Sequence, residues 1–183
     1  MSHLKLYMLL LGCKPQGRHT EQHDIFFGIG ESLKSLVPSI LDFWKEANGK
    51  IHIDGWREVT CQDDYRIEIV PKEGQHNEPA AEKLFFINLG GYKPNEFEEF
   101  HYKILLVNTD KATAIQQAKQ NVFFKHTISP HIDDKYGVDV DDIYEIEEIL
   151  PAEIKEKYTI RISPAENTVN DELHLGYFKL DSL

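Results

Sequence analysis

The stretch Leu84-Phe85-Phe86-Ile87-Asn88-Leu89-Gly90-Gly91 decides the fold, because a close copy of it stands earlier in the chain. The earlier copy is Leu6-Tyr7-Met8-Leu9-Leu10-Leu11-Gly12-Cys13, so the glycines at positions 12 and 90 are offset by 78. A short apolar run that ends at a glycine is typical of a buried strand. Its recurrence predicts a chain built from two tandem copies of one unit.

Two short polar pairs recur at nearly the same spacing. Glu21-Gln22-His23 returns as Glu99-Phe100-His101 at an offset of 78, and His52-Ile53-Asp54 returns as His131-Ile132-Asp133 at an offset of 79. A polar, turn-rich segment around Asn77 separates the copies. We therefore expect residues 1–76 to be copy one and residues 77–183 to be copy two.

The landmarks together carry a family resemblance. An apolar strand ending in Leu-Gly-Gly, a Glu-x-His, an amphipathic helix and a His-x-Asp resemble the bacterial family known as domain of unknown function 1543. The resemblance covers roughly residues 6–70 and 84–163 and implies two copies of that domain. It implies no activity. Copy one departs from the pattern at Cys13, which stands where the second glycine belongs.

Hydrophobic periodicity predicts the elements of each copy. In copy one we expect strands at 4–11, 24–29, 50–54, 56–60 and 65–70, with a turn at Asp54-Gly55 and a helix over 31–46. In copy two we expect strands at 84–89 and 102–107 and a helix over 110–125. The predicted fold class is α+β, with two tandem strand-strand-helix-strand-strand units, a mixed sheet, and helices packed on one face.

The copies diverge after Asp133. Tyr65–Pro71 matches residues from Tyr144 at an offset of 79, or Tyr158–Pro164 at an offset of 93. The second match is longer and we prefer it. It leaves an insertion of fourteen residues, the difference between 93 and 79, which contains a predicted acidic amphipathic helix near 141–150. A final strand is expected near 173–180.

Composition excludes several classes of partner. The chain has 183 residues, a net charge of −11 and a pI near 5.2, which argues against nucleic acid and against anionic membranes. No apolar run approaches the length of a transmembrane helix. The two cysteines form no zinc or C-x-x-C spacing and suit a reducing compartment, so we expect a cytoplasmic protein.

The polar pairs are the main candidate site. Residues i and i+2 of a strand share a face, so each pair presents two polar groups together. If the pairs of one copy meet, imidazole and carboxylate groups could bind zinc or non-haem iron, or transfer protons. The leading interpretation is that they are structural and satisfy each other or nearby loop amides, and the metal or proton-transfer role is the alternative. The candidates are Glu21, His23, His52, Asp54, Glu99, His101, His131 and Asp133.

Three other features have weaker functional interpretations. A basic loop with Lys14, Arg18 and His19 could hold an anion, or it is a solvated loop. The glycines at strand ends, Gly12, Gly90 and Gly91, are expected to supply turns. The acidic segment near 141–150 could dock a basic partner, or it is a solvated face.

The leading hypothesis is a small non-catalytic binding or regulatory module built from a duplicated unit. The alternative is a metal-dependent or acid–base enzyme that uses the Glu-x-His and His-x-Asp pairs. We expect no cofactor, and a divalent metal is the alternative. The sequence names no partner, and it leaves a protein partner and self-association both open.

Overall fold

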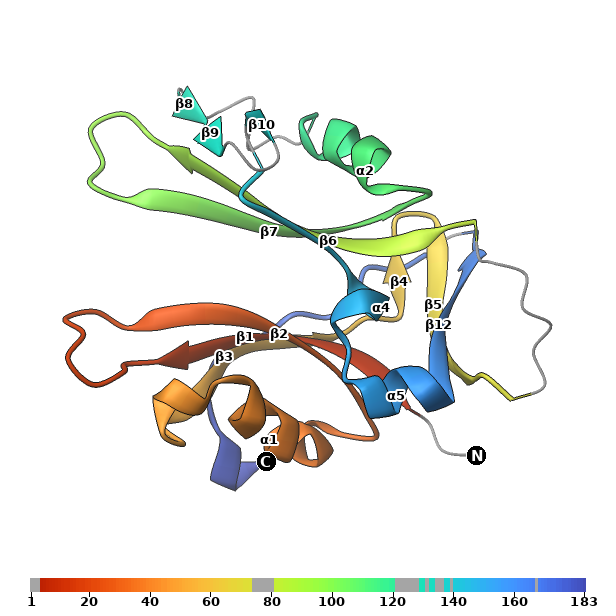
Figure 1. Cartoon of the computed structure of the whole chain (residues 1–183), viewed down its shortest axis with the longest axis horizontal. Coiled ribbons are helices and arrows are strands. Elements are labelled where there is room, and N and C mark those ends of the chain that lie inside the picture. The colour runs from red at the N-terminus through yellow and green to blue at the C-terminus, as the bar shows by residue number, and fades with distance from the viewer. Residues whose placement is uncertain are drawn as a thin grey trace. The chain divides into compact units, whose positions relative to one another are not determined.

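The computed structural model describes residues 4–73, 81–120, 129–130, 132–133, 137–138, 140–166 and 168–183. It divides into two compact units, each described by itself below (Figure 1). Unit 1 contains Met1–Gln75 and Leu150–Leu183, and unit 2 contains His76–Ile149. Within the described ranges no helix is long and apolar enough to cross a membrane.

The main sheet of unit 1 has four strands in the order β13-β3-β1-β2. Their bounds are β1 Lys5–Cys13, β2 Gln22–Gly30, β3 Ile51–Glu58 and β13 His174–Lys179. The central strand β1 buries Leu9 and Leu11 completely, and these side chains pack with Ile53 of β3 and Ile40 of helix α1. Burial of these aliphatic side chains ties the helix to the sheet.

Helix α1 (Leu33–Phe43) confirms the predicted helix. It begins two residues later and ends three residues earlier than the predicted range 31–46. Ser32 caps it: its hydroxyl accepts from the Ser35 N–H, and the Ser35 hydroxyl accepts from the Ser32 N–H. Pro38 lies inside the helix. A short 3-10 turn, η1 (Lys45–Ala47), follows and ends at Asn48, whose φ is 49°.

The turn predicted at Asp54-Gly55 is wrong. Strand β3 continues through both residues, and the register against β1 shifts by one residue between Leu10 and Leu11. A bulge of this kind absorbs one extra residue without ending the strand.

Unit 1 also has a three-stranded sheet in the order β12-β5-β4. Its strands are β4 (Cys61–Gln62), β5 (Tyr65–Pro71) and β12 (Tyr158–Pro164), and helix α5 (Ala152–Lys157) precedes β12. The register is symmetric: Tyr65 opposes Pro164, Tyr158 opposes Pro71, and Glu68 faces Arg161 at the centre. Strand β13 ends in a 3-10 turn, η2 (Leu180–Ser182).

The sheet of unit 2 has the order β11-β6-β7. Its elements are β6 (Lys83–Tyr92), β7 (Glu99–Asn108), helix α2 (Lys111–Ala118), β8 (Ser129–Pro130), β9 (Ile132–Asp133), β10 (Gly137–Val138), β11 (Asp142–Glu145) and α4 (Ile146–Ile149). The pair β9–β10 is a separate ribbon, and β8 adds to β6. Phe85, Ile87 and Leu89 of β6 are fully buried and pack with Ala114 and Ala118 of α2.

Two expectations for unit 2 need comment. Helix α2 begins as predicted, with Asp110 accepting from the Thr113 N–H as its cap, and ends at Ala118; the predicted extension to 125 runs into residues outside the described part. The helix predicted near 141–150 is wrong over its first half. Residues 142–145 are strand β11, because they pair with the free side of β6, and only Ile146–Ile149 is helical.

The two units repeat one register. Gly12 opposes His23 as Gly90 opposes His101, and Leu9 opposes Trp56 as Ile87 opposes Ile143. Strands β6 and β7 follow β1 and β2 at an offset of 78, whereas β11 follows β3 at an offset of 87.

The predicted α+β class is confirmed. All strand pairs formed by the described residues are antiparallel, which narrows the mixed sheet of the prediction to an antiparallel one. The repeat boundaries 1–76 and 77–183 stay a prediction about the sequence. The compact units are a different grouping, since residues 150–183 pack with the first part of the chain.

Candidate metal site

Gly12 and Gly90 do not form turns, contrary to the prediction for these glycines and for Gly91. All three lie within β1 or β6, and none has a positive φ. Gly12 and Gly90 instead leave space for side chains of neighbouring segments. A Cβ on Gly12 would overlap with Asp54 Oδ2 and His52 Nε2, and a Cβ on Gly90 would overlap with the Asp141 carboxylate. Each glycine therefore lies under a cluster of polar side chains that fills the volume of the missing methyl group.

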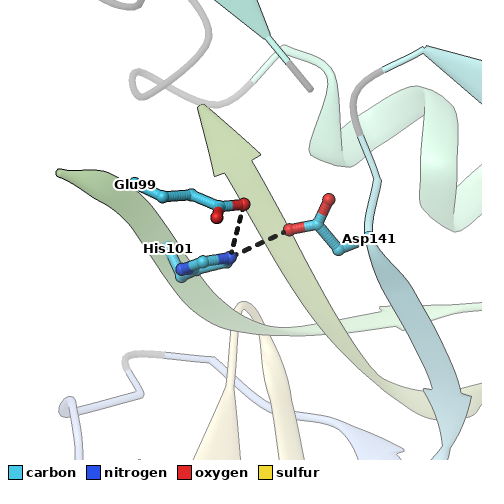
Figure 2. Close-up of side chains that lie close together, drawn as sticks. All are labelled: Glu99, His101 and Asp141. Atoms are coloured by element: carbon cyan, nitrogen blue, oxygen red, sulfur yellow. Dashed lines mark ion pairs between the residues drawn. The ribbon is translucent and has the colours of Figure 1, made fainter. Parts of the chain in front are cut away.

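In unit 2 the cluster consists of Glu99, His101 and Asp141 (Figure 2). Glu99 and His101 extend from the same face of β7, two residues apart, and Asp141 precedes β11. His101 Nε2 lies 3.3 Å from Glu99 Oε1 and 3.3 Å from Asp141 Oδ2. One ligand atom from each residue lies within 4.8 Å of both others. A backbone hydrogen bond from Asp141 N–H to the Asn88 carbonyl (3.0 Å) holds the aspartate against β6.

In unit 1 the structure brings together all four residues predicted for copy one. His52 Nε2 lies 3.1 Å from Glu21 Oε1 and 3.2 Å from Asp54 Oδ1. His23 Nε2 lies 3.1 Å from Asp54 Oδ2 and 3.9 Å from Glu21 Oε2. Each imidazole nitrogen thus faces two carboxylates across Gly12, which pairs with His23 on one side and His52 on the other.

The short contact between the His23 imidazole and the Asp54 carboxylate in unit 1 is not a hydrogen bond. Asp54 Oδ2 is shielded from solvent and receives no hydrogen bond from the described residues, although His23 Nε2 is 3.1 Å away. A buried carboxylate oxygen normally accepts at least one hydrogen bond. An orphaned oxygen beside an imidazole nitrogen instead suits two ligands that point at a shared cation.

Asp141 is the site residue that the sequence interpretation missed. The predicted counterpart of Asp54 was Asp133, at an offset of 79; Asp133 lies in β9, and neither its side chain nor His131 belongs to the described part. The signal was present, since Ile51-His52-Ile53-Asp54 matches Val138-Asp139-Val140-Asp141 at an offset of 87 in its alternation of β-branched and polar residues. Ile53 and Val140 are both completely buried.

An ion pair repeats at the same offsets beyond the clusters. Lys5 Nζ lies 2.6 Å from Glu58 Oε1, and Lys83 Nζ lies 2.8 Å from Glu145 Oε2. A hydrogen bond to the partner glutamate raises the pKa of both lysines. Both lysines therefore stay charged, and they form ion pairs with these glutamates rather than with the cluster carboxylates.

Cys13 lies one residue after Gly12 and is fully buried. Burial raises the pKa of its thiol, and the nearby Glu21 carboxylate raises it further. Because a cysteine binds metals as the thiolate, this thiol is a poor ligand in its present surroundings.

The other candidates are not brought into a site by the described contacts. Lys14, Arg18 and His19 are exposed in the loop between β1 and β2, and the anion site predicted there stays a prediction. A cavity of about 480 Å³ in unit 1 is lined by Leu6, Cys61, Arg66 and Val169 among others, and none of its lining residues belongs to the cluster. The cavity is therefore separate from the cluster.

Comparison with known proteins supports the fold and leaves the chemistry open. The family model described as Domain of Unknown Function (DUF1543) matches residues 18–69, a range that contains all four cluster residues of unit 1. The chain is also similar to the crystal structure of a protein Il1583 from Idiomarina loihiensis, with 20% sequence identity, a TM-score of 0.64 and coverage of 97% of both chains. This similarity shows a shared fold. No curated protein matches the chain.

Proposed function

We propose that this chain is a non-catalytic binding module whose ligand is a divalent metal ion, held in unit 2 by Glu99, His101 and Asp141. One observation carries the proposal: an imidazole nitrogen and two carboxylate oxygens lie within 4.8 Å of one another. Imidazole with carboxylate is a ligand combination that zinc, iron and manganese accept.

The separations suit a coordination sphere. Ligands about 2.0 Å from a tetrahedral zinc ion lie roughly 3.3 Å apart. His101 Nε2 lies 3.3 Å from each of its two carboxylate neighbours. An ion could therefore enter with small side-chain adjustments.

Charge favours a cation at this position. Metals bind carboxylates in the ionised form and imidazole in the neutral form, so this ligand set carries a charge of −2 when it binds, which a divalent ion balances. The whole chain has a net charge of −11 and attracts cations at long range.

We also propose that the chain arose by duplication and acts in a bacterial cytoplasm. The equal registers of the two units, their helices capped by Ser32 and Asp110 at an offset of 78, and the symmetric pairing of β5 with β12 support duplication. Two cysteines outside any disulfide suit a reducing compartment.

Partial exposure of the unit 2 cluster keeps an enzyme as the second candidate. The side chains of His101 and Glu99 are 32% and 39% exposed. Three protein ligands beside solvent leave a coordination position for water, which is the pattern of catalytic zinc sites. Hydrolysis of generic phosphate and carboxylate esters by the metal-loaded protein, lost in Asp141→Asn, would favour this candidate.

Thermal melts with and without a chelator test the metal proposal. Metal at a hundred times its Kd stabilises the folded state by about 2.7 kcal/mol, and for a chain of this size that corresponds to a rise in Tm of roughly 5–11 °C. With Mn²⁺ as the added metal, His101→Ala should lose this rise, and the control His19→Ala, at an exposed histidine in a loop of unit 1, should keep it. Elemental analysis of natively purified protein gives an independent measure. Equal metal responses in wild type and His101→Ala, with equal metal content, would contradict the proposal.

A further inference from the structure

We infer that Glu21, His23, His52 and Asp54 of unit 1 form a second metal site, and that its metal preference differs from that of unit 2. This inference rests on the proposed function and adds a site and a division of metals between sites. The unit 1 site is the more selective for zinc-class ions, and the unit 2 site also accepts harder ions such as Mn²⁺.

The four side chains alternate around Gly12 as carboxylate, imidazole, carboxylate, imidazole. The contacts between neighbours are 3.1 Å (Glu21 to His52), 3.2 Å (His52 to Asp54), 3.1 Å (Asp54 to His23) and 3.9 Å (His23 to Glu21). These contacts use both oxygens of each carboxylate, Oε1 and Oε2 of Glu21 and Oδ1 and Oδ2 of Asp54, so each carboxylate faces both imidazoles and a shared ion must draw one oxygen of each inward. The fourth contact is the only wide side of the ring.

One half of this ring is fixed. The His52 side chain is 8% exposed, and the Tyr177 ring of β13 covers it with a centroid separation of 4.3 Å. Asp54 is 26% exposed and lies at the bulge of β3. These two ligands are positioned by the sheet before any ion arrives.

The other half can move. The side chains of Glu21 and His23 are 44% and 43% exposed, at the start of β2. No three ligand atoms of this cluster all lie within 4.8 Å in the described structure, whereas those of unit 2 do. Metal binding in unit 1 therefore requires the exposed pair to move inward, which closes the 3.9 Å side.

The ligand sets differ in chemistry. Unit 1 offers two imidazoles and two carboxylates, whereas the group formed by the described residues of unit 2 contains one imidazole and two carboxylates. Imidazole suits zinc, copper and nickel, and carboxylate suits manganese and magnesium. The described ligand set of unit 2 has one imidazole fewer than that of unit 1, and this difference shifts its metal preference toward the harder ion.

The missing Cβ of Gly12 is a second, independent observation. A methyl group there would overlap with Asp54 Oδ2 and His52 Nε2, and would lie 2.9 Å from His52 Cε1. The backbone of β1 thus leaves space for the ligand atoms to converge above it. The orphaned Asp54 Oδ2 points into the same space.

Equilibrium dialysis with Zn²⁺ and with Mn²⁺, each alone, tests the inference on the full chain. The variants are His23→Ala for unit 1, chosen because His23 is exposed and its loss should spare folding, and Asp141→Asn for unit 2. His19→Ala is the matched control, and circular dichroism confirms that each variant is folded.

We expect His23→Ala to weaken zinc binding in unit 1 by at least about tenfold, since altering even an outer partner of a metal ligand commonly has that effect. Its manganese binding should equal that of wild type, and Asp141→Asn should lose manganese while keeping the zinc bound in unit 1. Unchanged zinc binding in His23→Ala, or equal loss of both metals, would overturn the inference. If Asp141→Asn loses metal and His23→Ala does not, the proposed function stands without the second site. If only His23→Ala loses metal, the unit 2 proposal falls.

Discussion

Replacement of Gly90 by alanine should destabilise the protein through one contact, that with Asp141. The backbone of Gly90 has no positive φ, so alanine suits the local conformation. The new Cβ would overlap with Asp141 Oδ2 and would lie 2.9 Å from both Cγ and Oδ1 of that residue. Inserting a methyl group into a filled volume costs about 1–3 kcal/mol. For a chain of this size, that is a fall in Tm of roughly 2–12 °C.

Urea unfolding of a double-mutant cycle isolates that contact. Gly90→Ala, Asp141→Ala and the double variant are compared with wild type by the free energy of unfolding. Removal of the Asp141 carboxylate opens the volume that the alanine methyl needs. The double variant should therefore be about as stable as Asp141→Ala alone. If Gly90→Ala costs the same in both backgrounds, the contact with Asp141 does not explain the glycine, and the reasoning fails.

Three further predictions concern other parts of the chain. Burial raises the pKa of both thiols, Cys13 and Cys61, so at neutral pH a thiol reagent should react slowly with native protein and rapidly after unfolding; fast native labelling of Cys13 would contradict its burial. Hydrogen bonds from Thr113 lower the pKa of Asp110, so this cap stabilises the fold above the unfolded pKa and the gain is lost as pH falls below about 4. Asp110→Asn should keep a cap and show a flatter acid-side stability curve by urea unfolding, and an unchanged curve would refute the assignment. Deletion of residues 173–183 should lower the urea midpoint, because it removes β13 and the packing of Phe178 on the core; an unchanged midpoint would show that this strand is dispensable.

The residues of the unit 1 cluster could be predicted from the sequence because they form two pairs with strand spacing. Side chains two residues apart share a face, and the order of apolar strands around Gly12 brought Glu21-x-His23 and His52-x-Asp54 to opposite sides of β1. The functional role of these residues stays a prediction. The spacing predicted that each pair shares a face, and the order β3-β1-β2 brings the two pairs together.

Asp141 escaped prediction because register depends on what a strand pairs with. The match of His131-Ile132-Asp133 to His52-Ile53-Asp54 was the stronger match in letters. The strand that pairs with β6 comes nine residues later than that of copy one, at an offset of 87 rather than 78, and its acidic composition suggested a helix. The burial of Ile143 against the core, which a list of residues cannot show, decides in favour of the strand.

The glycines were misassigned for a related reason. A glycine after an apolar run usually ends a strand, but β1 and β6 continue past Gly12 and Gly90. The side chains that need the empty volume come from other strands, at positions far along the sequence. Only the three-dimensional arrangement shows that the space a Cβ would need at Gly12 and Gly90 is occupied by side chains from elsewhere in the sequence.

Because unit 1 combines residues 1–75 with residues 150–183, it cannot be completed until the second of these segments has left the ribosome. Residues 76–149 emerge as one continuous segment and can fold while synthesis proceeds, whereas β3 and β5 must wait for partners encoded after residue 150. During that interval each of the two strands has an exposed edge able to pair with another nascent chain. Slow translation of residues 150–183 would prolong that exposure. The yield of folded protein on expression should therefore depend on how quickly these thirty-four residues are synthesised.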